Sequence, residues 1–505
     1  MSVSFIDQVP VKIGTAKEFE RVAEILQQAS FDEETICRKL RLKDMSDTGW
    51  LRDDEDISPE LRLLVRLFFQ SMLVPRAEVE QVFDRATIDV FLSLGLLGIG
   101  EFGNDQYYAR CWLYPVGGFF IASDRYSMPD GSAFRPPPDI AFPAIYRGSL
   151  QFLKLLPEGI TGDVLDLCAG VGIGALVLSQ AGSQVVSVDL SERATQFARF
   201  NCALNRRENI EVLRSDLYEA VNGRTFDCIV AHLPWITEVN RGLHDAYAGG
   251  ESLCKRLVGG LTESLRPGGV CFALTQGRDT KEGKFEERVR TWLKGGADEF
   301  DILFAYYEVL TSLEILKSIA RRDRTSGPEA MAKLESDFEL AGLSKMLFGG
   351  LYIRRHKTRS REPWTARRAL SNATGGADVM SAFILHDWIS GPDSVARILE
   401  CRPQLAPRLQ IMSKQVVREA ALVPGEFIFE TDKPFAARDS FEAWTVRVLA
   451  RFDGQTTVAK VFEDAQTATM PEGVTREGYV ALITRALEAG YLVLPEMTLL
   501  SAQGG

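Results

Sequence analysis

The sequence predicts an α/β protein whose central domain is a seven-stranded, largely parallel sheet. Short apolar runs alternate with helical segments from residue 146 to about residue 355, which is typical of such a sheet. The first of these runs passes directly into a glycine-rich turn. A chain of 505 residues also exceeds one ordinary core. We therefore expect three parts, at residues 1–134, 135–360 and 361–505.

The N-terminal part is expected to be helical. Helical periodicity covers residues 15–43 and resumes at Ser58-Pro59-Glu60, where Ser would cap the helix and Pro would occupy its first turn. Residues 106–123 predict two strands around a Pro-Val-Gly-Gly turn. Helices followed by a hairpin indicate a winged-helix-like unit, which we expect to be a scaffold or a substrate cap.

The central part contains the predicted sheet. A helical insert around 312–343 separates its last two strands, which should form an antiparallel hairpin. We expect strands near 163–167, 184–189, 210–213, 226–231, 269–275, 301–309 and 346–354. In the C-terminal part, the pattern within 443–494 is helix, turn, helix, helix, strand, which predicts a second winged-helix-like domain.

The composition of the chain indicates which kinds of partner and which cellular compartment to expect. The net charge of −11 argues mildly against a long nucleic acid as partner. The arginine-rich stretch Ile353–Arg368 is expected to be a solvated linker or a phosphate-binding strip. Eight scattered cysteines without a Cys-x-x-Cys pair favour reduced thiols, and we expect no metal site. No secretory signal and no apolar run of about 20 residues is present, so we expect a cytoplasmic protein without membrane contact.

The strongest chemical signal lies in residues 162–191. A strand ending at Leu167 runs into Cys168-Ala169-Gly170-Val171-Gly172, and a helix follows. Glycines allow a sharp turn and a close approach to a ligand, and the helix start presents free N–H groups. Asp189 ends the next strand and can accept both hydroxyls of a ribose. These features alone would also suit a nicotinamide dinucleotide.

Two further carboxylates favour a different cofactor. Asp166 lies within the first strand, where its charge would repel a pyrophosphate but help to anchor a cationic amino-acid cofactor. Ser215-Asp216-Leu217 follows the third strand, where an acid can accept from an adenine amino group. The fourth strand ends in His232-Leu233-Pro234-Trp235.

Here the chain resembles class I S-adenosylmethionine-dependent methyltransferases. Asp166-x-Cys168-x-Gly170-x-Gly172 matches the first motif of that family, with Cys at its first glycine. The resemblance implies a Rossmann-like sheet with S-adenosyl-L-methionine as cofactor. The residues that would contact the cofactor are Tyr146, Ser149, Asp166, Ala169, Gly170, Gly172, Asp189, Leu190, Asp216 and Leu217.

His232-Leu233-Pro234-Trp235 stands where N-methyltransferases of the release-factor glutamine and ribosomal-guanine groups carry Asn-Pro-Pro-Tyr. In those groups the loop accepts hydrogen bonds from the target nitrogen and stacks on it. Here Trp235 can stack and the Leu233 carbonyl can accept. His232 replaces the Asn, so it could accept a hydrogen bond or act as a base.

The resemblance implies N-methylation of a protein, a peptide or a natural product. Three alternatives stay open: an RNA N-methyltransferase, an O-methyltransferase with His232 as base, and a cofactor-binding module without catalysis. The acidic balance favours a protein, peptide or small-molecule acceptor over RNA. The sequence leaves the identity of the acceptor and the oligomeric state open.

Overall fold

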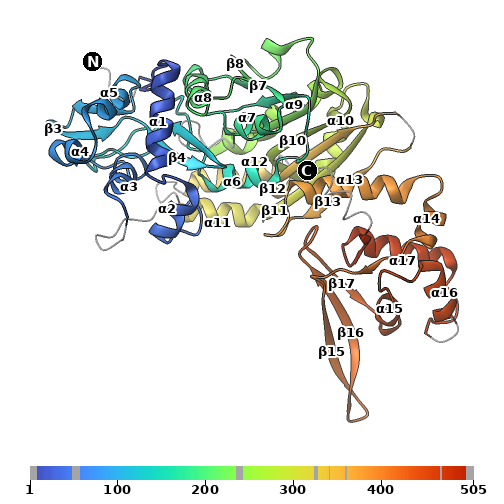
Figure 1. Ribbon diagram of the computed structural model, residues 1–505. Coiled ribbons are helices and arrows are strands. Elements are labelled where there is room, and N and C mark those ends of the chain that lie inside the picture. The colour runs from blue at the N-terminus through green and yellow to red at the C-terminus, as the bar shows by residue number, and fades with distance from the viewer. Residues whose placement is uncertain are drawn as a thin grey trace. The chain divides into compact units, whose positions relative to one another are not determined.

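The computed structural model describes residues 8–47, 57–234, 243–322, 328–340, 342–358, 361–466 and 469–495 (Figure 1). The chain forms two compact units. The first comprises Met1–Leu153 and Ile160–Thr275, and the second comprises Lys154–Gly159 and Gln276–Gly505. Within the described ranges, the helices are too short or too polar to cross a membrane.

The N-terminal part of the first unit is helical, as predicted. Thr15 and Glu18 form a capping box on the first helix, and Ser58 caps the third. The helices are α1 (Ala16–Gln28), α2 (Glu33–Leu40), α3 (Pro59–Leu64), the π-helix η1 (Val65–Phe69), α4 (Arg76–Val82) and α5 (Arg85–Ser93).

The strands of this part form two small sheets. The first has the order β1-β3-β2, with β1 at Val74–Pro75, β2 at Leu97–Gly100 and β3 at Gly103–Ala109. The second is the predicted hairpin, β4 (Trp112–Val116) with β5 (Phe119–Ser123). We expected residues 106–123 to form two strands of one hairpin. This was wrong for residues 106–109, because they belong to β3, which pairs with β1 and β2. The winged-helix assignment stays a prediction.

The hairpin is fixed to a helix that also supports the large sheet. Asn201 of α8 (Glu192–Leu204) accepts from the Ala122 amide at 2.8 Å, and Asn205 accepts from the Phe120 amide at 2.9 Å. Arg193 pairs with Asp124, and both side chains are almost fully buried. The hydrogen bonds satisfy backbone groups of β5, whose side would otherwise be an open edge.

The largest sheet has eight strands in the order β13-β11-β12-β10-β9-β6-β7-β8. The five strands from β10 to β8 are parallel, and β11 and β12 form the predicted antiparallel hairpin. The strands are β6 (Asp163–Leu167), β7 (Gln184–Asp189), β8 (Ile210–Arg214), β9 (Phe226–His232), β10 (Leu265–Thr280), β11 (Phe300–Thr311), β12 (Leu343–Arg355) and β13 (Thr365–Ala369). The predicted α/β class is confirmed, and all seven expected strands are present.

The eighth strand, β13, lies in the segment that we expected to be a linker or a phosphate-binding strip. It pairs in parallel with β11 from Ile302↔Thr365 to Tyr306↔Ala369. Its sequence, Thr-Ala-Arg-Arg-Ala, lacks the apolar alternation of a strand. The linker interpretation was therefore wrong for these residues.

Helices accompany these strands in both units. They are α6 (Arg147–Leu155), α7 (Ile173–Leu178), α9 (Leu243–Ser264), α10 (Phe285–Trp292), α11 (Ser312–Arg322) and α12 (Pro328–Leu340), with short 3₁₀ turns η2 (Ser179–Ala181), η3 (Glu219–Val221) and η4 (Ala297–Glu299). Strands β6, β7 and β9 are buried along almost their whole length. Such continuous apolar runs are typical of a parallel sheet that is covered on both faces.

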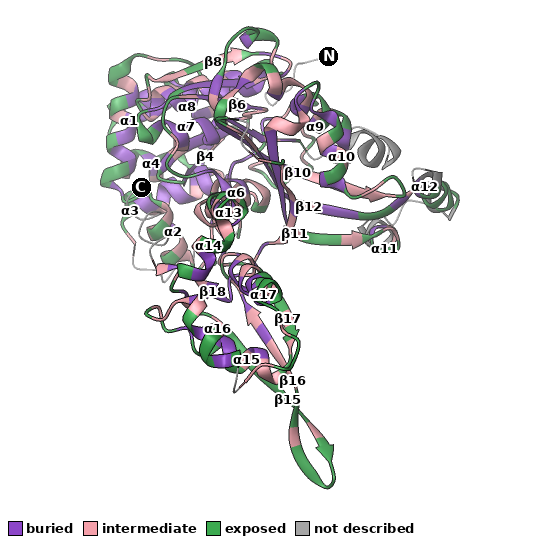
Figure 2. Ribbon diagram, turned by 90° about the vertical axis from the view of Figure 1, so that its right-hand side faces the viewer, coloured by how far each residue is buried: buried purple, intermediate pink, exposed green. Residues whose placement is uncertain are grey.

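The remainder of the second unit contains the predicted helices at 443–449, 458–466 and 476–488. An additional sheet, β15-β16-β17, was not predicted, and the far end of its β15–β16 hairpin is exposed on both faces (Figure 2). The elements are α13 (Gly376–Ser390), α14 (Ser394–Glu400), β14 (Gln404–Leu405), β15 (Gln410–Arg418), β16 (Ala421–Thr431), β17 (Ala437–Phe441), α15 (Ala443–Leu449), α16 (Val458–Gln466), α17 (Arg476–Glu488) and β18 (Leu492–Val493).

Candidate functional site

The turn from β6 into α7 places Asp166 under the start of the helix. Its Oδ2 accepts from the Ala175 amide at 2.8 Å, and the side chain is 1% exposed. The described residues give Oδ1 no hydrogen-bond partner. Burial raises the pKa of Asp166 to about 7, and the nearby Asp189 adds to the rise. This carboxyl group is therefore poised to change charge near neutral pH.

The turn itself requires left-handed backbone at three of its residues. Cys168, Gly170 and Gly172 have φ values of +55°, +55° and +85°. A Cβ on Gly172 would lie 3.1 Å from the Ala198 Cβ, whereas a Cβ on Gly170 would meet no atom within 4 Å. Gly172 therefore allows α7 to approach α8, and Gly170 borders open space. The Gly172 amide donates to the Ala169 carbonyl at 2.9 Å, which closes the turn.

Asp189 lies at the end of β7, next to the same turn. Its Oδ2 accepts from the Gly170 amide and its Oδ1 from the Ser191 amide, both at 2.9 Å. These two bonds fix the carboxylate, and each oxygen keeps a lone pair for a further donor. Burial raises the pKa of Asp189, although the backbone hydrogen bonds oppose the rise. Leu190, which follows it, is 63% exposed and could lie against a ligand.

At the end of β8, Asp216 contacts a partner that the sequence did not suggest. Arg256 of α9 lies 2.9 Å from the Asp216 Oδ1. The neighbouring Ser215 amide donates to the Asp189 carbonyl at 2.9 Å, which joins the two strand ends. Leu217 is buried with a φ of +51°. Asp216 thus lies at the expected edge of the sheet. To accept a hydrogen bond from an adenine amino group, its carboxylate would have to serve Arg256 as well.

His232 ends β9 with its ring in an apolar environment. The ring stacks on Phe152 of α6 at 5.3 Å with an interplanar angle of 14°, and Phe152 stacks in turn on Phe272. Burial lowers the pKa of His232 to about 4, so the imidazole is neutral at pH 7. A Cβ on Gly148 would lie 3.6 Å from the His232 Nε2, so α6 approaches the ring closely. No pattern in the sequence predicted this contact with Phe152.

The residues after His232 are only partly described. The Leu233 amide donates to the Leu274 carbonyl at 3.2 Å, and Leu233 is buried. Pro234 is exposed. Trp235, the expected stacking residue, lies outside the described residues.

Tyr146 and Ser149 lie at the start of α6. Tyr146 contacts Tyr126 and Phe142, with ring centroids at 5.6 and 6.5 Å. Burial raises the pKa of the Tyr146 hydroxyl, so it stays protonated. Ser149 is half-buried next to Gly148 and therefore close in sequence to the contact with His232. The contacts of Gly148 and Phe152 with the His232 ring place this helix near the end of β9.

The structure therefore brings the three expected acids to one edge of the first unit. Asp166, Asp189 and Asp216 come from the ends of three neighbouring parallel strands, where open α/β sheets bind ligands. Arg256, Ser191 and Phe152 join them, and sequence reasoning missed all three. Among the side chains that the structure describes, no group of three acids, histidines or cysteines could hold a metal ion. All eight cysteines are free.

The arginine-rich stretch lies in the second unit and is largely neutralised there. Arg354 and Arg361 pair with Asp301 and Asp387, at 2.7 to 2.8 Å for the bonds of Arg354. Arg355 pairs with Glu299 at 2.8 Å. Arg367 reaches Asp279 at 2.6 Å and Glu286 at 2.5 Å. These arginines serve internal ion pairs, which weakens the expectation of a phosphate-binding strip.

Residues 143–292, which include every site residue described above, match the family model "Methyltransferase small domain". Residues Tyr146 to Leu233 lie within this matched segment, and the resemblance inferred from the motifs is confirmed.

Individual relatives match shorter stretches of this domain. The chain is 38% identical over 91 residues to a release factor glutamine methyltransferase of Shewanella oneidensis, covering 18% of this chain and 32% of the relative. It is 30% identical over 128 residues to a ribosomal RNA small subunit methyltransferase C of Yersinia enterocolitica, covering 25% of this chain and 34% of the relative. The chain thus spans about a third of the length of these curated relatives.

Among solved structures, a ribosomal protein L11 methylase from Lactobacillus delbrueckii subsp. bulgaricus is similar. Its TM-score is 0.24 at 18% identity, covering 41% of this chain and 77% of that chain.

Proposed function

We propose that this protein is an S-adenosyl-L-methionine-dependent methyltransferase that methylates nitrogen on a protein, a peptide or a natural product. One observation carries the proposal: Asp166, Gly170 and Asp189 meet at the carboxyl edge of the sheet within a methyltransferase small domain. The observations favour a transferase over a module without catalysis, because β9 ends in His232, a side chain that can accept a hydrogen bond, next to the cofactor motif.

The site residues fit the cofactor. Open space borders Gly170, so the backbone of the turn is accessible to a ligand. Asp189 is held by two amides in a position to accept ribose hydroxyls, and Asp166 has an oxygen available for an ammonium group. The bound cofactor would supply an electrophilic methyl group on a sulfonium. The remaining work of the chain is to orient the acceptor nitrogen and to exclude water.

His232 fits the role of a hydrogen-bond acceptor better than that of a general base. Its neutral ring can accept one hydrogen bond from an acceptor N–H. With a pKa of about 4, a base is poorly matched to pH 7. The stacking on Phe152 fixes the ring plane, which suits positioning. We therefore favour N-methylation over O-methylation that uses His232 as base.

A protein or peptide acceptor is favoured over RNA. The first relative named above is a release factor glutamine methyltransferase, which has a protein substrate by name. The ribosomal RNA relative keeps the RNA alternative open. The paired arginines of the second unit argue against it, because an RNA site needs cations that are free to neutralise phosphates. The eight free cysteines support a reducing compartment, and we infer that the protein acts in the cytoplasm.

The decisive experiment is calorimetry of the full-length protein with S-adenosyl-L-methionine and its demethylated product. Asp189→Ala should weaken binding by about 1–3 kcal/mol, because ribose hydroxyls would lose their acceptor. Glu192→Ala is the matched control, since Glu192 is an exposed acid three residues later and should leave affinity unchanged. Unchanged affinity in Asp189→Ala would refute the ribose site. Tight binding of a nicotinamide dinucleotide without S-adenosyl-L-methionine binding would refute the function.

A further inference from the structure

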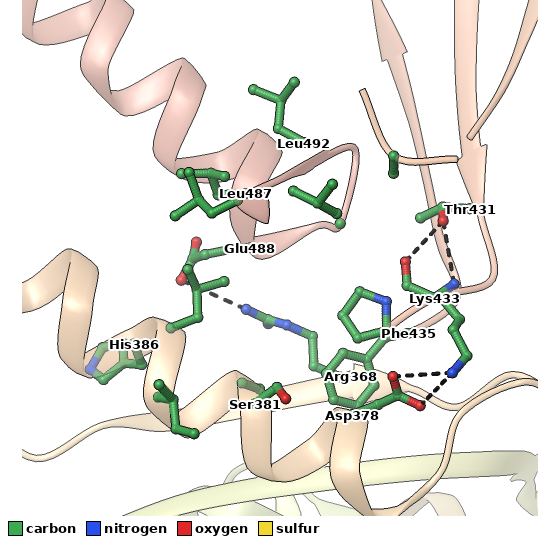
Figure 3. A pocket seen from close by; sticks show the side chains of 18 of the residues that line it. Arg368, Asp378, Ser381, His386, Thr431, Lys433, Phe435, Leu487, Glu488 and Leu492 are labelled. Atoms are coloured by element: carbon green, nitrogen blue, oxygen red, sulfur yellow. Dashed lines mark hydrogen bonds and ion pairs between the residues drawn. The ribbon is translucent and has the colours of Figure 1, made fainter. Parts of the chain in front are cut away.

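The second unit contains a cavity that the proposed function does not use. It has a volume of about 540 Å³, within the range of about 300–1,000 Å³ that is common for ligand pockets. Apolar side chains from α13, α17 and β18 and from the loop after β16 form most of its wall (Figure 3). They include Ile384, Leu385, Leu487, Leu492 and Phe435. The apolar part of a bound ligand would therefore be shielded from water in this cavity.

One wall of the cavity is held rigidly. Trp364 lines it, and the Trp364 amide donates to Asp301 at 2.9 Å. The Trp364 carbonyl accepts from the Ile302 amide at 2.8 Å and from Arg290 at 2.7 Å. The indole stacks on His386, with ring centroids 4.4 Å apart. Because this wall is already ordered, little conformational entropy is lost there when a ligand binds.

Charged side chains of both signs line the same cavity. Arg408 is already engaged in two hydrogen bonds with Asp432. Two cations and two anions then remain: Arg368 and Lys433 with Glu488 and Asp378. Because these charges balance, a ligand with a single net charge would meet repulsion as well as attraction. A zwitterion could satisfy both signs.

The Arg368–Glu488 pair is the more open of the two. The Arg368 Nη2 lies 3.9 Å from the Glu488 Oε1, which is too long for a hydrogen bond. The only hydrogen bond that the described residues give to the Arg368 guanidinium runs to the Arg367 carbonyl at 3.1 Å. Lys433, in contrast, lies 3.3 and 3.4 Å from the two oxygens of Asp378. Arg368 and Glu488 therefore keep hydrogen-bonding capacity toward the cavity, on β13 and α17 respectively (Figure 3).

We propose that this cavity binds a small zwitterion with an apolar body, of the kind represented by a free apolar amino acid. Arg368 binds its carboxylate, Glu488 binds its ammonium group, and the apolar walls cover its side chain. The proposal goes beyond the proposed function, and its test needs neither cofactor nor methyl transfer.

The first arm of the test changes the ligand and leaves the full-length protein intact. Calorimetry would compare L-phenylalanine with N-acetyl-L-phenylalanine, L-phenylalaninamide and L-serine. We expect saturable binding of L-phenylalanine and at least about tenfold weaker binding of each comparison ligand, since each lacks one charge or the apolar body. Equal or tighter binding of either blocked derivative, or no saturable binding of L-phenylalanine at millimolar concentration, would overturn the proposal.

The second arm changes the protein. Glu488→Gln should bind L-phenylalanine about as weakly as the unchanged protein binds N-acetyl-L-phenylalanine. Arg368→Gln should bind it about as weakly as the unchanged protein binds L-phenylalaninamide. Ile384→Asp places a charge on the apolar wall at a side chain that is 51% exposed, and should abolish binding. Val395→Asp is its control, because Val395 is 56% exposed on α14 and does not line the cavity.

Circular dichroism would verify that each variant is folded. Equal losses in Ile384→Asp and Val395→Asp, or unchanged affinity in both charge variants, would contradict the assignment. Tighter binding of a short blocked peptide of apolar residues than of L-phenylalanine would show that the cavity recognises amide groups, and would also overturn it.

Discussion

At the scale of the single residue, His232 shows how surroundings decide a role that the residue type leaves open. A histidine at the end of a strand could accept a hydrogen bond or remove a proton near neutral pH. The ring stacks on Phe152, and burial lowers its pKa to about 4, which favours the first role. The proton that the methyl acceptor loses would therefore have to be taken up by a group other than His232.

We expect His232→Asn to keep activity within about tenfold of the unchanged enzyme, because an amide oxygen can also accept a hydrogen bond. At a concentration of S-adenosyl-L-methionine that saturates the enzyme throughout this range, the rate of the unchanged enzyme should show no titration between about pH 6 and pH 7, since the His232 pKa lies lower. Steady-state kinetics with a labelled methyl group would measure both. A loss of about 10²–10⁴-fold with a rate that titrates near pH 6–7 would identify His232 as a general base.

Asp166 is a second residue whose charge depends on the fold. Burial raises its pKa to about 7, above the value of about 3.9 in an unfolded chain. A carboxyl group whose pKa is raised stabilises the folded state fully below about pH 4, and this contribution is lost as the pH rises through 7.

Cofactor binding should show the opposite dependence on pH, because the ionised Asp166 attracts a cationic ligand. We expect the affinity for S-adenosyl-L-methionine to rise between about pH 6 and pH 8 in the unchanged protein. In Asp166→Asn the affinity should be lower and nearly constant. The folded apo variant should be more stable than the unchanged protein at about pH 8, where Asp166 carries a buried charge. Calorimetry and thermal unfolding across this range would measure both effects, and a flat affinity profile in the unchanged protein would contradict the assignment.

At the scale of the element, an ion-pair network joins the start of β11 to the segment before β13. Asp301 is fully buried, and it accepts from Arg354 at 2.8 Å and from His356 at 2.9 Å. Burial alone would raise its pKa, but the hydrogen bonds from Arg361, His356 and Arg354 outweigh burial and hold the pKa well below its ordinary value. The network also binds the Trp364 amide, so it fixes the entry of the eighth strand.

We expect Asp301→Asn to lower the free energy of unfolding by about 3–5 kcal/mol at pH 7, because Arg354 and Arg361 would lose their buried counter-charge and keep only the more exposed Asp387. The loss should shrink as the pH falls below about 4, since a group with a lowered pKa stabilises the fold only while it is ionised. Chemical denaturation monitored by circular dichroism would measure it. Asp393→Asn, at an exposed aspartate without a capping hydrogen bond, should change stability little. Equal stability of the two variants would show that the network contributes nothing.

At the scale of the whole molecule, the distribution of charge decides which partners are favoured. The chain carries a net charge of −11, and its densest arginine stretch pairs with acids of the second unit. A protein of this kind attracts a polyanion only weakly.

We therefore expect a mixed-sequence RNA hairpin to bind the full-length protein weakly at physiological ionic strength. A plot of log affinity against log salt should have a shallow slope, because few arginines are free to neutralise phosphates. Fluorescence anisotropy across a salt series would measure it, with Arg355→Gln as a comparison that removes one paired arginine. Nanomolar binding with a steep slope that falls in Arg355→Gln would favour the RNA alternative.

The sequence by itself determined the α/β class, the seven expected strands and the positions of Asp166, Gly170, Gly172 and Asp189. These features are local, because strand periodicity, glycine in a left-handed turn and an acid at a strand end follow from neighbouring residues. Only the tertiary structure decided what depends on groups distant in sequence. It paired Asp216 with Arg256, stacked His232 on Phe152 and made a strand of Thr365–Ala369, whose Arg367 pairs with acids 81 and 88 residues earlier in the chain. Ion pairs and ring contacts across such separations carry no periodic signal, so the charge state of His232 and the eighth strand could be known only from the folded chain.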